Sequence, residues 1–391
     1  MTVSGRVWSF TSESVACGHP DKVADLIADR LLDAVMESHA GYPRPRVAAE
    51  VLVTGDRVVL AGETSHPLEE EVVEATAREA IAEAGYGPGD PEFPCDGVQI
   101  TNLIQKQSSE IAEMVVGEEI GAGDQGIIFG FACDDTPSLM PLPIHLAHRL
   151  ARKLAEVREE GIVDYLRPDG KTQVTVEYRG RAPVRVTQVV VSAHHLAGID
   201  EATLRADIER EVIRTVVPPE LLDGGARFLI NHSGSFTAGG PGADTGLTGR
   251  KLVVDTYGGY GPHGGGALSG KDPTKVDRSA SYAARHAAKN LVAAGLARQC
   301  SIQLSYVIGM HEPLSLHVEC SNTNQVPLED LERALQEVLS FRPQQMIEKL
   351  GLWDIRFGDT TLYGHFGRED AGFSWEKTDS TEQLRAAALG G

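Results

Sequence analysis

The chain lacks the features that would tie it to a membrane, a disulfide framework or a nucleic acid. No apolar run approaches the roughly 18 residues of a membrane-spanning helix, and the N-terminus has no hydrophobic segment typical of a signal peptide. The five cysteines are odd in number and form no CxxC pair, which argues against disulfides or a zinc site and favours free thiols in a reducing cytoplasm. The formal net charge of −20 disfavours nonspecific nucleic-acid binding. We therefore expect a cytoplasmic protein that binds neither membrane nor nucleic acid.

The sequence predicts the same order of helices and strands three times along the chain. With 391 residues it is long enough for two or three domains. Apolar periodicity predicts a helix, two strands, a helix and a strand in each set, and the third set has no obvious last strand. The first set is expected at 21–38, 46–54, 57–63, 68–84 and 97–103, the second at 144–160, 172–178, 184–193, 201–216 and 227–231, and the third at 279–295, 301–308, 314–319 and 328–340.

This order predicts an α+β fold of three similar domains, each a mostly antiparallel sheet covered by helices, with a pseudo-threefold repeat. We expect an N-terminal domain at 1–110, a central domain at 120–235 and a C-terminal domain with glycine-rich phosphate-binding loops at 236–391. Glycine-rich joints at 118–130 and 233–270 lie between the units, where ligand sites often occur. The polar tail at 357–391 is expected to wrap the surface.

The stretch from Gly234 to Ala283 combines many glycines with clustered charges. Glycine lets the backbone approach a ligand closely, clustered cations suit a polyanion, and interspersed carboxylates suit a metal bound to it. A long surface loop of turns would explain the glycines but not the cations. The cations are Arg250, Lys251, His263, Lys271, Lys275 and Arg278, and the carboxylates are Asp244, Asp272 and Asp277.

A second candidate site begins the first helix. Pro20 fits the first helical turn, the free N–H groups there attract phosphate, His19 and Lys22 add donors, and Asp21 could hold a divalent ion. Alternatively, Asp21 only improves the electrostatics of the helix start.

Several other motifs, taken alone, are explained equally well as ordinary turns or solvent-facing residues. Residues 121–126 (GAGDQG), which precede an apolar strand at 127–131, and residues 167–171 (RPDGK) fit tight turns. Glu50 and Glu63 lie in apolar strands, where a buried carboxylate would need a cation or a metal.

The segment Gly265–Lys271 satisfies GxxxxGK and lies between an expected strand at 251–257 and a helix, as a Walker A loop would. However, Asp272 and Pro273 follow where Ser or Thr should bind Mg²⁺ and the helix should continue. A kinase-like ATP phosphotransferase is therefore disfavoured.

The longer motifs resemble those of the S-adenosylmethionine synthetase family, in order and over nearly the whole chain. They are GHPDK at 18–22, GAGDQG at 121–126, GGP at 239–241, DTGLTGRKLVVDTYGG at 244–259, HGGGALSGKDPTKVDRSA at 263–280 and YGHFGR at 363–368. The resemblance implies conversion of ATP, L-methionine and water to S-adenosylmethionine, phosphate and pyrophosphate. It also implies a homodimer with active sites at the subunit interface, which in the family often pairs into a dimer of dimers (a homotetramer).

The resemblance also implies residue roles. The residues expected to act in catalysis, by binding the ATP phosphates and stabilising the leaving triphosphate, are His19, Lys171, Arg250, Lys271 and Lys275. ATP contacts fall to the same His19, Lys171, Arg250 and Lys271, with Lys251, Asp169, Phe236 (against the adenine), Asp244 and Ala267. Methionine contacts fall to Glu63, Gln107, Asp124, Asp244, Lys275 and Ile308. Two Mg²⁺ per site would be held by Asp21 and Asp277, contributed by opposite subunits, and K⁺ by Glu50, whose neighbours differ from the family's usual Ala-Cys-Glu-Thr.

One segment departs from the family pattern. After Lys106-Gln107-Ser108 the chain does not continue with the usual Pro-Asp-Ile, and the loop at 107–120 is a few residues shorter. In the family this loop is a mobile gate, so we expect altered gating and a wider tolerance for methionine analogues. A catalytically silent homologue would show decay of the charged residues, and none is missing here.

Overall fold

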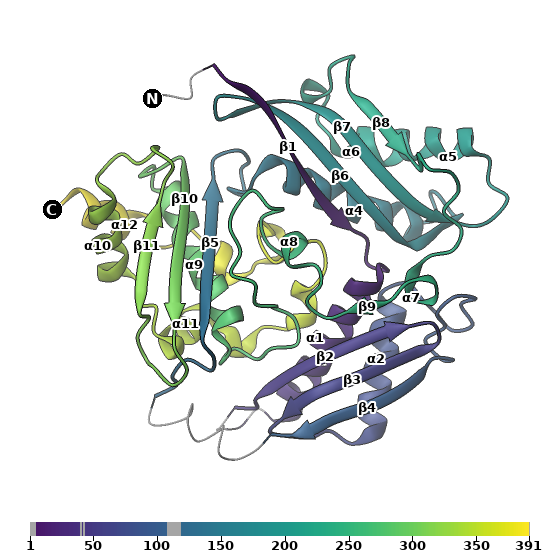
Figure 1. The fold of residues 1–391 in the computed structure, drawn as a ribbon, viewed down its shortest axis with the longest axis horizontal. Helices are drawn as coiled ribbons and strands as arrows, with labels where there is room; N and C mark the ends of the chain where they lie inside the picture. Colours follow the sequence, from purple (N-terminus) through teal and green to yellow (C-terminus); the bar gives the residue numbers. More distant parts are fainter. Residues whose placement is uncertain (1–4, 40, 42–43, 108–118, 391) are drawn as a thin grey trace.

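Three sheets and the helices packed on them make up the protein (Figure 1). The computed structural model describes residues 5–39, 41, 44–107 and 119–390. Most of the gate segment, 108–118, lies outside the described residues, and the expectations about gating remain predictions. The three sheets and their helices confirm the predicted α+β class.

The N-terminal unit is built on a sheet of order β4-β3-β2-β9. Strands β2 and β3 are antiparallel, while β3 and β4 are parallel. Helices α1 and α2 pack on each other, and α1 contacts β2. The bounds are α1 Pro20–Ser38, β2 Val47–Thr54, β3 Arg57–Thr64, α2 Glu70–Glu83, β4 Gln99–Lys106 and β9 Gly246–Leu247.

The central unit has a sheet of order β1-β6-β7-β8, in which β1, β6 and β7 pair antiparallel. Helix α4 packs on β1 and β6. The helix expected at 201–216 is present, but its middle forms a π-helical turn, η1. The bounds are β1 Val7–Val15, α4 Leu142–Glu159, β6 Leu166–Arg179, β7 Ala182–His195, α5 Glu201–Asp207, η1 Ile208–Ile213, α6 Arg214–Val216, η2 Pro219–Leu221 and β8 Arg227–Ile230.

The C-terminal unit has the sheet β11-β10-β5, antiparallel throughout, with α9 packed on β5 and β10. The bounds are β5 Gly126–Cys133, α7 Gly240–Ala243, α8 Leu252–Asp255, α9 Val276–Ala293, β10 Gln299–Tyr306, β11 Ser315–Glu319, α10 Leu328–Val338, α11 Pro343–Leu350 and α12 Thr381–Leu389. The tail between α11 and α12 forms the short turns η3 Leu352–Asp354, η4 Phe357–Thr360, η5 Glu369–Ala371 and η6 Ser374–Glu376.

The sheets exchange strands along the chain. Strand β1 lies in the central sheet, β9 pairs with β2 of the N-terminal sheet, and β5 completes the C-terminal sheet. Strand β5 therefore supplies the strand that the third set lacked. The strand expected at 251–257 is wrong, because Leu252–Asp255 forms the short helix α8 and turns follow it.

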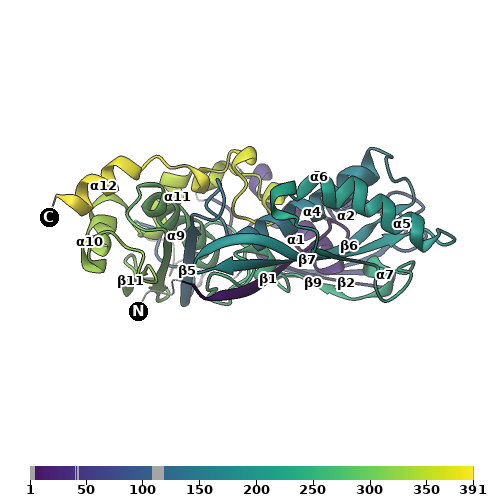
Figure 2. The ribbon, with the colours of Figure 1, turned by 90° about the horizontal axis from the view of Figure 1, so that it is seen from above.

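The strands gather toward one side of the molecule and most helices toward the other (Figure 2). One continuous apolar core joins the N-terminal and C-terminal units, and a separate core fills the central unit. None of the helices in the described ranges is long and apolar enough to span a bilayer. All five cysteines are free and buried.

Buried ion pairs attach the tail to the core. The Glu376 carboxylate accepts hydrogen bonds from Arg285 at 2.9 Å and from Lys289 at 2.8 Å, and all three side chains are at most 2% exposed. Burial alone would raise the pKa of Glu376, but Arg285 and Lys289 hold it below the ordinary value. Likewise Arg278 binds both carboxylate oxygens of Asp29, at 2.7 and 3.0 Å, and neither side chain is exposed.

The substitution Glu376→Gln should lower the free energy of unfolding by about 3 kcal/mol, since it leaves the buried Arg285 without a carboxylate and Lys289 with Glu369 alone. Because the folded-state pKa is depressed, this stabilisation is present above the ordinary glutamate pKa of about 4.3 and is lost as the pH falls through the folded value. Denaturant unfolding from pH 7 to pH 3 measures both effects. The exposed Glu79→Gln is the control and should stay within about 0.5 kcal/mol. Equal stability of the two variants would contradict the role given to Glu376.

Candidate active site

The first site element is the corner where β1 leads into α1. His19 is the N-cap of α1, and its Nδ1 accepts a hydrogen bond from the Asp21 N–H at 3.2 Å. Gly18 lies against Pro168 so closely that a Cβ at residue 18 would be 2.4 Å from the Pro168 Cβ. The Tyr86 hydroxyl donates to the Gly18 carbonyl at 2.7 Å. Glycine at 18 therefore brings the helix start against β6.

His19 is neutral in this setting. Burial, together with the positive charges of Lys251 and Lys171, lowers its pKa to about 3. Because Nδ1 accepts from a backbone N–H, the single ring proton is on Nε2. His19 can therefore donate one hydrogen bond to a phosphate oxygen, but it adds no positive charge.

Asp21 is the centre of the first charged cluster. Its carboxylate accepts from the Leu247 N–H at 3.0 Å and from the Lys251 ammonium, and Arg250 Nε lies 3.6 Å away. Burial acts to raise the pKa of Asp21, but the Lys251 and Leu247 hydrogen bonds outweigh it and the pKa is lowered. The carboxylate is thus kept ionised.

Two cations singled out in the sequence have structural roles instead. Lys22 is buried and its ammonium binds Asp25 at 3.0 Å and Asp255 at 2.7 Å. Arg278 is fully enclosed against Asp29. Neither is available to a polyphosphate.

The second charged cluster lies at the start of α9. Lys271 Nζ is 2.5 Å from Asp277 Oδ2, and Lys275 pairs with the buried Asp272. Asp272 also accepts from the Val47 N–H at 2.6 Å, so it fixes the loop to β2. No strand precedes Gly265–Lys271 directly and α9 begins only at Val276, so the segment is not a Walker A loop.

On the nucleotide side, Asp169 is buried and accepts from the Gly240 N–H at 2.9 Å, and burial raises its pKa. The Phe236 ring stacks on His194 with centroids 5.0 Å apart, and its N–H donates to His195 Nε2 at 3.1 Å. Lys171, Asp244 and Arg250 are exposed, and Ala267 is half-buried.

On the methionine side, Gln107 Nε2 donates to Glu63 Oε1 at 2.7 Å. Asp124 and Glu50 are exposed, and Ile308 is 48% exposed. No hydrogen bond or ion pair joins these three residues to the Glu63–Gln107 pair within the described ranges.

Within the described ranges, no hydrogen bond or ion pair joins Asp21 or Lys251 of the first charged cluster to Lys271 or Asp277 of the second. Nor do the described residues contain a group of three or more His, Cys, Asp or Glu side chains that could hold a metal ion. A divalent ion at either aspartate would therefore need ligands from elsewhere, such as phosphate oxygens.

Sequence reasoning missed Asp272, His194 and His195 as supports of the site. Asp272 had been noted only as one carboxylate among the glycines, although its position three residues before Lys275 matches the ion pair they form. His194 and His195 are the last two residues of β7. Their position at the end of a strand is the sequence feature that could have identified them as part of the site.

Comparison with known proteins gives one result over the whole chain. Models of the N-terminal, central and C-terminal domains of S-adenosylmethionine synthetase match residues 7–109, 119–236 and 238–377. The S-adenosylmethionine synthase of Desulforudis audaxviator (strain MP104C) is 48% identical over 394 residues, covering 98% of this chain and 99% of that protein. That of Syntrophobacter fumaroxidans (strain DSM 10017 / MPOB) is 47% identical over 384 residues, covering 97% and 98%.

These matches and the three α+β units define a metal-dependent transferase that uses ATP. More specifically, the chain belongs to the S-adenosylmethionine synthetase family. It is a methionine adenosyltransferase, which makes S-adenosylmethionine from ATP and methionine.

Replacing Gly266→Ala should impair the second charged cluster without unfolding the protein. A Cβ at residue 266 would lie 2.3 Å from the Asp277 carboxyl carbon, so the carboxylate must move. If Asp277 binds Mg²⁺, initial rates measured against Mg²⁺ concentration should show a raised metal requirement. Gly224→Ala, where a Cβ would meet nothing within 4 Å, is the matched control. If both variants have the same metal dependence, the Asp277 carboxylate does not govern it.

Proposed function

We propose that the methionine sulfur attacks C5′ of ATP in line with the departing triphosphate, and that the bound triphosphate is then hydrolysed to phosphate and pyrophosphate. The sulfur is already a nucleophile and needs no general base. The main task is stabilising the charge that develops on the leaving triphosphate, together with alignment of the reacting atoms. The observation that carries this proposal is the pair of cation–carboxylate clusters on glycine-rich backbone, Asp21 with Lys251 and Asp277 with Lys271.

In this proposal the cations of both clusters bind the triphosphate. Arg250, Lys251, Lys271, Lys275 and Lys171 supply positive charge, and His19 donates its Nε2 proton to a phosphate oxygen. Asp169, Asp244 and Ala267 contact the nucleoside, and Phe236 lies against the adenine on the support of His194. Glu63, Gln107, Asp124, Asp244, Lys275 and Ile308 bind methionine. The hydrogen bond between Glu63 and Gln107 supports a shared role for that pair.

The family is metal-dependent, and we propose Mg²⁺ and K⁺ as the ions. Asp21 and Asp277 suit Mg²⁺, which favours one or two carboxylates together with substrate phosphates, and this fits the absence of larger ligand groups from the described residues. Mg²⁺ would neutralise charge on the phosphate oxygens. Glu50 on β2 would hold K⁺. The free, buried cysteines support a reducing cytoplasm.

Lys271→Ala should lower the rate of sulfonium formation by about 10²–10³-fold, because it removes a cation from the departing triphosphate. Single-turnover formation of S-adenosylmethionine from ATP and methionine, followed by mass spectrometry, measures this step. Lys153→Ala on α4 removes a charge whose ion-pair partner among the described residues is Glu156, and it is the control. Near-normal turnover in Lys271→Ala would exclude the assigned role.

We propose further that the active site forms between two subunits of a homodimer, which could pair again as a tetramer. The exposed apolar side chains on strands of three sheets support this, with Val7, Leu103 and Ile127 each more than half exposed. A subunit interface would cover such side chains.

Co-expressing Asp21→Asn and Asp277→Asn chains tests the shared site. In a mixed dimer, one of the two sites would hold both mutations and the other neither. Random pairing should therefore restore about a quarter of wild-type activity, while each variant alone is inactive. If each site came from a single chain, mixing would restore nothing. A stable monomer with full activity would also refute the proposal.

A further inference from the structure

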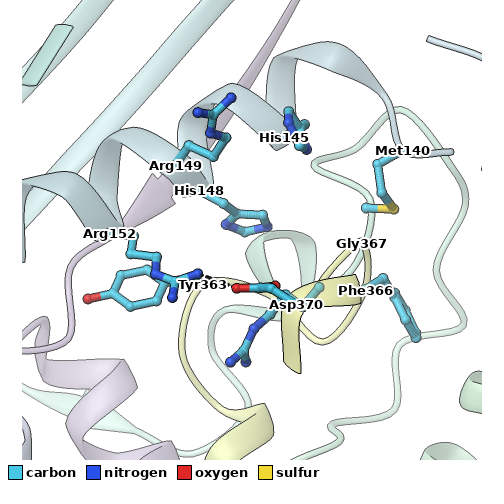
Figure 3. Close-up of a pocket in the computed structure, with 10 residues that line it drawn as sticks. Met140, His145, His148, Arg149, Arg152, Tyr363, Phe366, Gly367 and Asp370 are labelled. Atoms are coloured by element: carbon cyan, nitrogen blue, oxygen red, sulfur yellow. Dashed lines mark hydrogen bonds and ion pairs between the residues drawn. The ribbon is translucent and has the colours of Figure 1, made fainter. Parts of the chain in front are cut away.

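A cavity of about 210 Å³ lies between α4 and the tail segment 363–370 (Figure 3). Its lining includes His145, His148, Arg149 and Arg152 from α4, with Phe366 and Arg368 from the tail. None of these residues has a role in the active site proposed above.

The cavity is lined by more positive than negative charge. Three guanidinium groups, from Arg149, Arg152 and Arg368, accompany one lining carboxylate, Asp370. Arg152 Nη1 binds Asp370 Oδ2 at 2.7 Å, and Arg368 donates to two backbone carbonyls. Arg149 is exposed and makes no hydrogen bond or ion pair with any residue that the structure describes. In a chain of net charge −20, this concentration of cations favours an anionic ligand.

His148 provides an independent observation. Its side chain is buried, its Nδ1 lies 2.8 Å from the Ser14 hydroxyl, and its Nε2 has no hydrogen-bond partner among the described residues. Gly364 packs against this nitrogen, because a Cβ there would lie 2.5 Å from Nε2, and Nε2 itself is buried. Figure 3 shows the His148 ring in the midst of the lining side chains.

His148 carries a single ring proton. Burial, with the nearby His145 and Arg368, lowers its pKa to about 3, so the ring is neutral. The contact with Ser14 allows either tautomer, and Nε2 is a donor when the Ser14 hydroxyl donates to Nδ1. In that tautomer the buried N–H lacks an acceptor, which costs about 1–3 kcal/mol, and an anion oxygen that reached it would remove that cost.

We propose that this cavity is a second anion site, separate from the triphosphate site, which binds inorganic phosphate or a small phosphate monoester. A phosphate group offers several acceptor oxygens, which match the guanidinium groups of Arg149 and Arg152. The cavity has room beyond the phosphate group, and there Met140 and Phe366 would contact the organic part of an ester.

Equilibrium dialysis of the full chain against radiolabelled inorganic phosphate, in EDTA, tests the site. The wild type and Lys271→Ala should both retain it, because it does not involve the active-site lysine. Arg149→Gln should weaken binding at least about tenfold, equivalent to one charge-assisted hydrogen bond. Lys153→Gln removes one charge from the same helix outside the cavity and should bind phosphate like the wild type.

Competition with glycerol 3-phosphate separates the two sources of the phosphate group. Tighter competition than by unlabelled inorganic phosphate would identify a monoester site, and equal or weaker competition would identify an inorganic phosphate site. The proposal is overturned if Arg149→Gln and Lys153→Gln bind phosphate alike, or if Lys271→Ala alone abolishes all binding.

Discussion

The antiparallel pairing of β1 with β6 is the interaction on which the active site depends. It places Val15 opposite Lys171, so the residues just after β1 lie beside the first residues of β6. The same chain then turns at Gly18 and starts α1 with His19 and Asp21. Because β9 pairs with β2, Leu247 donates its backbone N–H to Asp21. Segments from three parts of the sequence are thus brought to the start of α1 by sheet hydrogen bonds.

Charge in this protein is divided between buried structural pairs and accessible pairs. Lys22 and Arg278 are enclosed by carboxylates and contribute to the fold. Lys251 and Lys271 keep some solvent exposure, 14% and 24% of their side chains, and their partners are the two aspartates that we assign to metal. A substrate phosphate can therefore reach Lys251 and Lys271 but not Lys22 and Arg278. All four residues have oppositely charged neighbours, so it is burial that distinguishes the accessible cations from the structural ones.

Much of the fold could be predicted from the sequence because its helices and strands carry regular apolar periodicity. The pairing of strands could not. The apolar strand near Ile127 was recognised, but nothing local shows that it pairs with β10 and not with the central sheet. The β-branched run at Val253 and Val254 favoured a strand, yet the segment forms α8 with glycine turns after it. For the site, the motifs indicated the phosphate-binding segments, whereas the burial of Lys22 and Arg278 depends on residues distant in sequence, Asp255 and Asp29.

The exchange of strands has a consequence for how the chain folds during synthesis. Strand β1 leaves the ribosome first, but its partner β6 follows only after about 150 further residues, so the N-terminal segment has to wait unpaired. Similarly, β5 is made long before β10. The three units therefore cannot fold one after another as independent domains, in contrast to the usual order for multidomain chains. A nascent chain stalled between residues 133 and 306 would expose an unpaired β5, which makes this stretch of translation the period of greatest risk of aggregation.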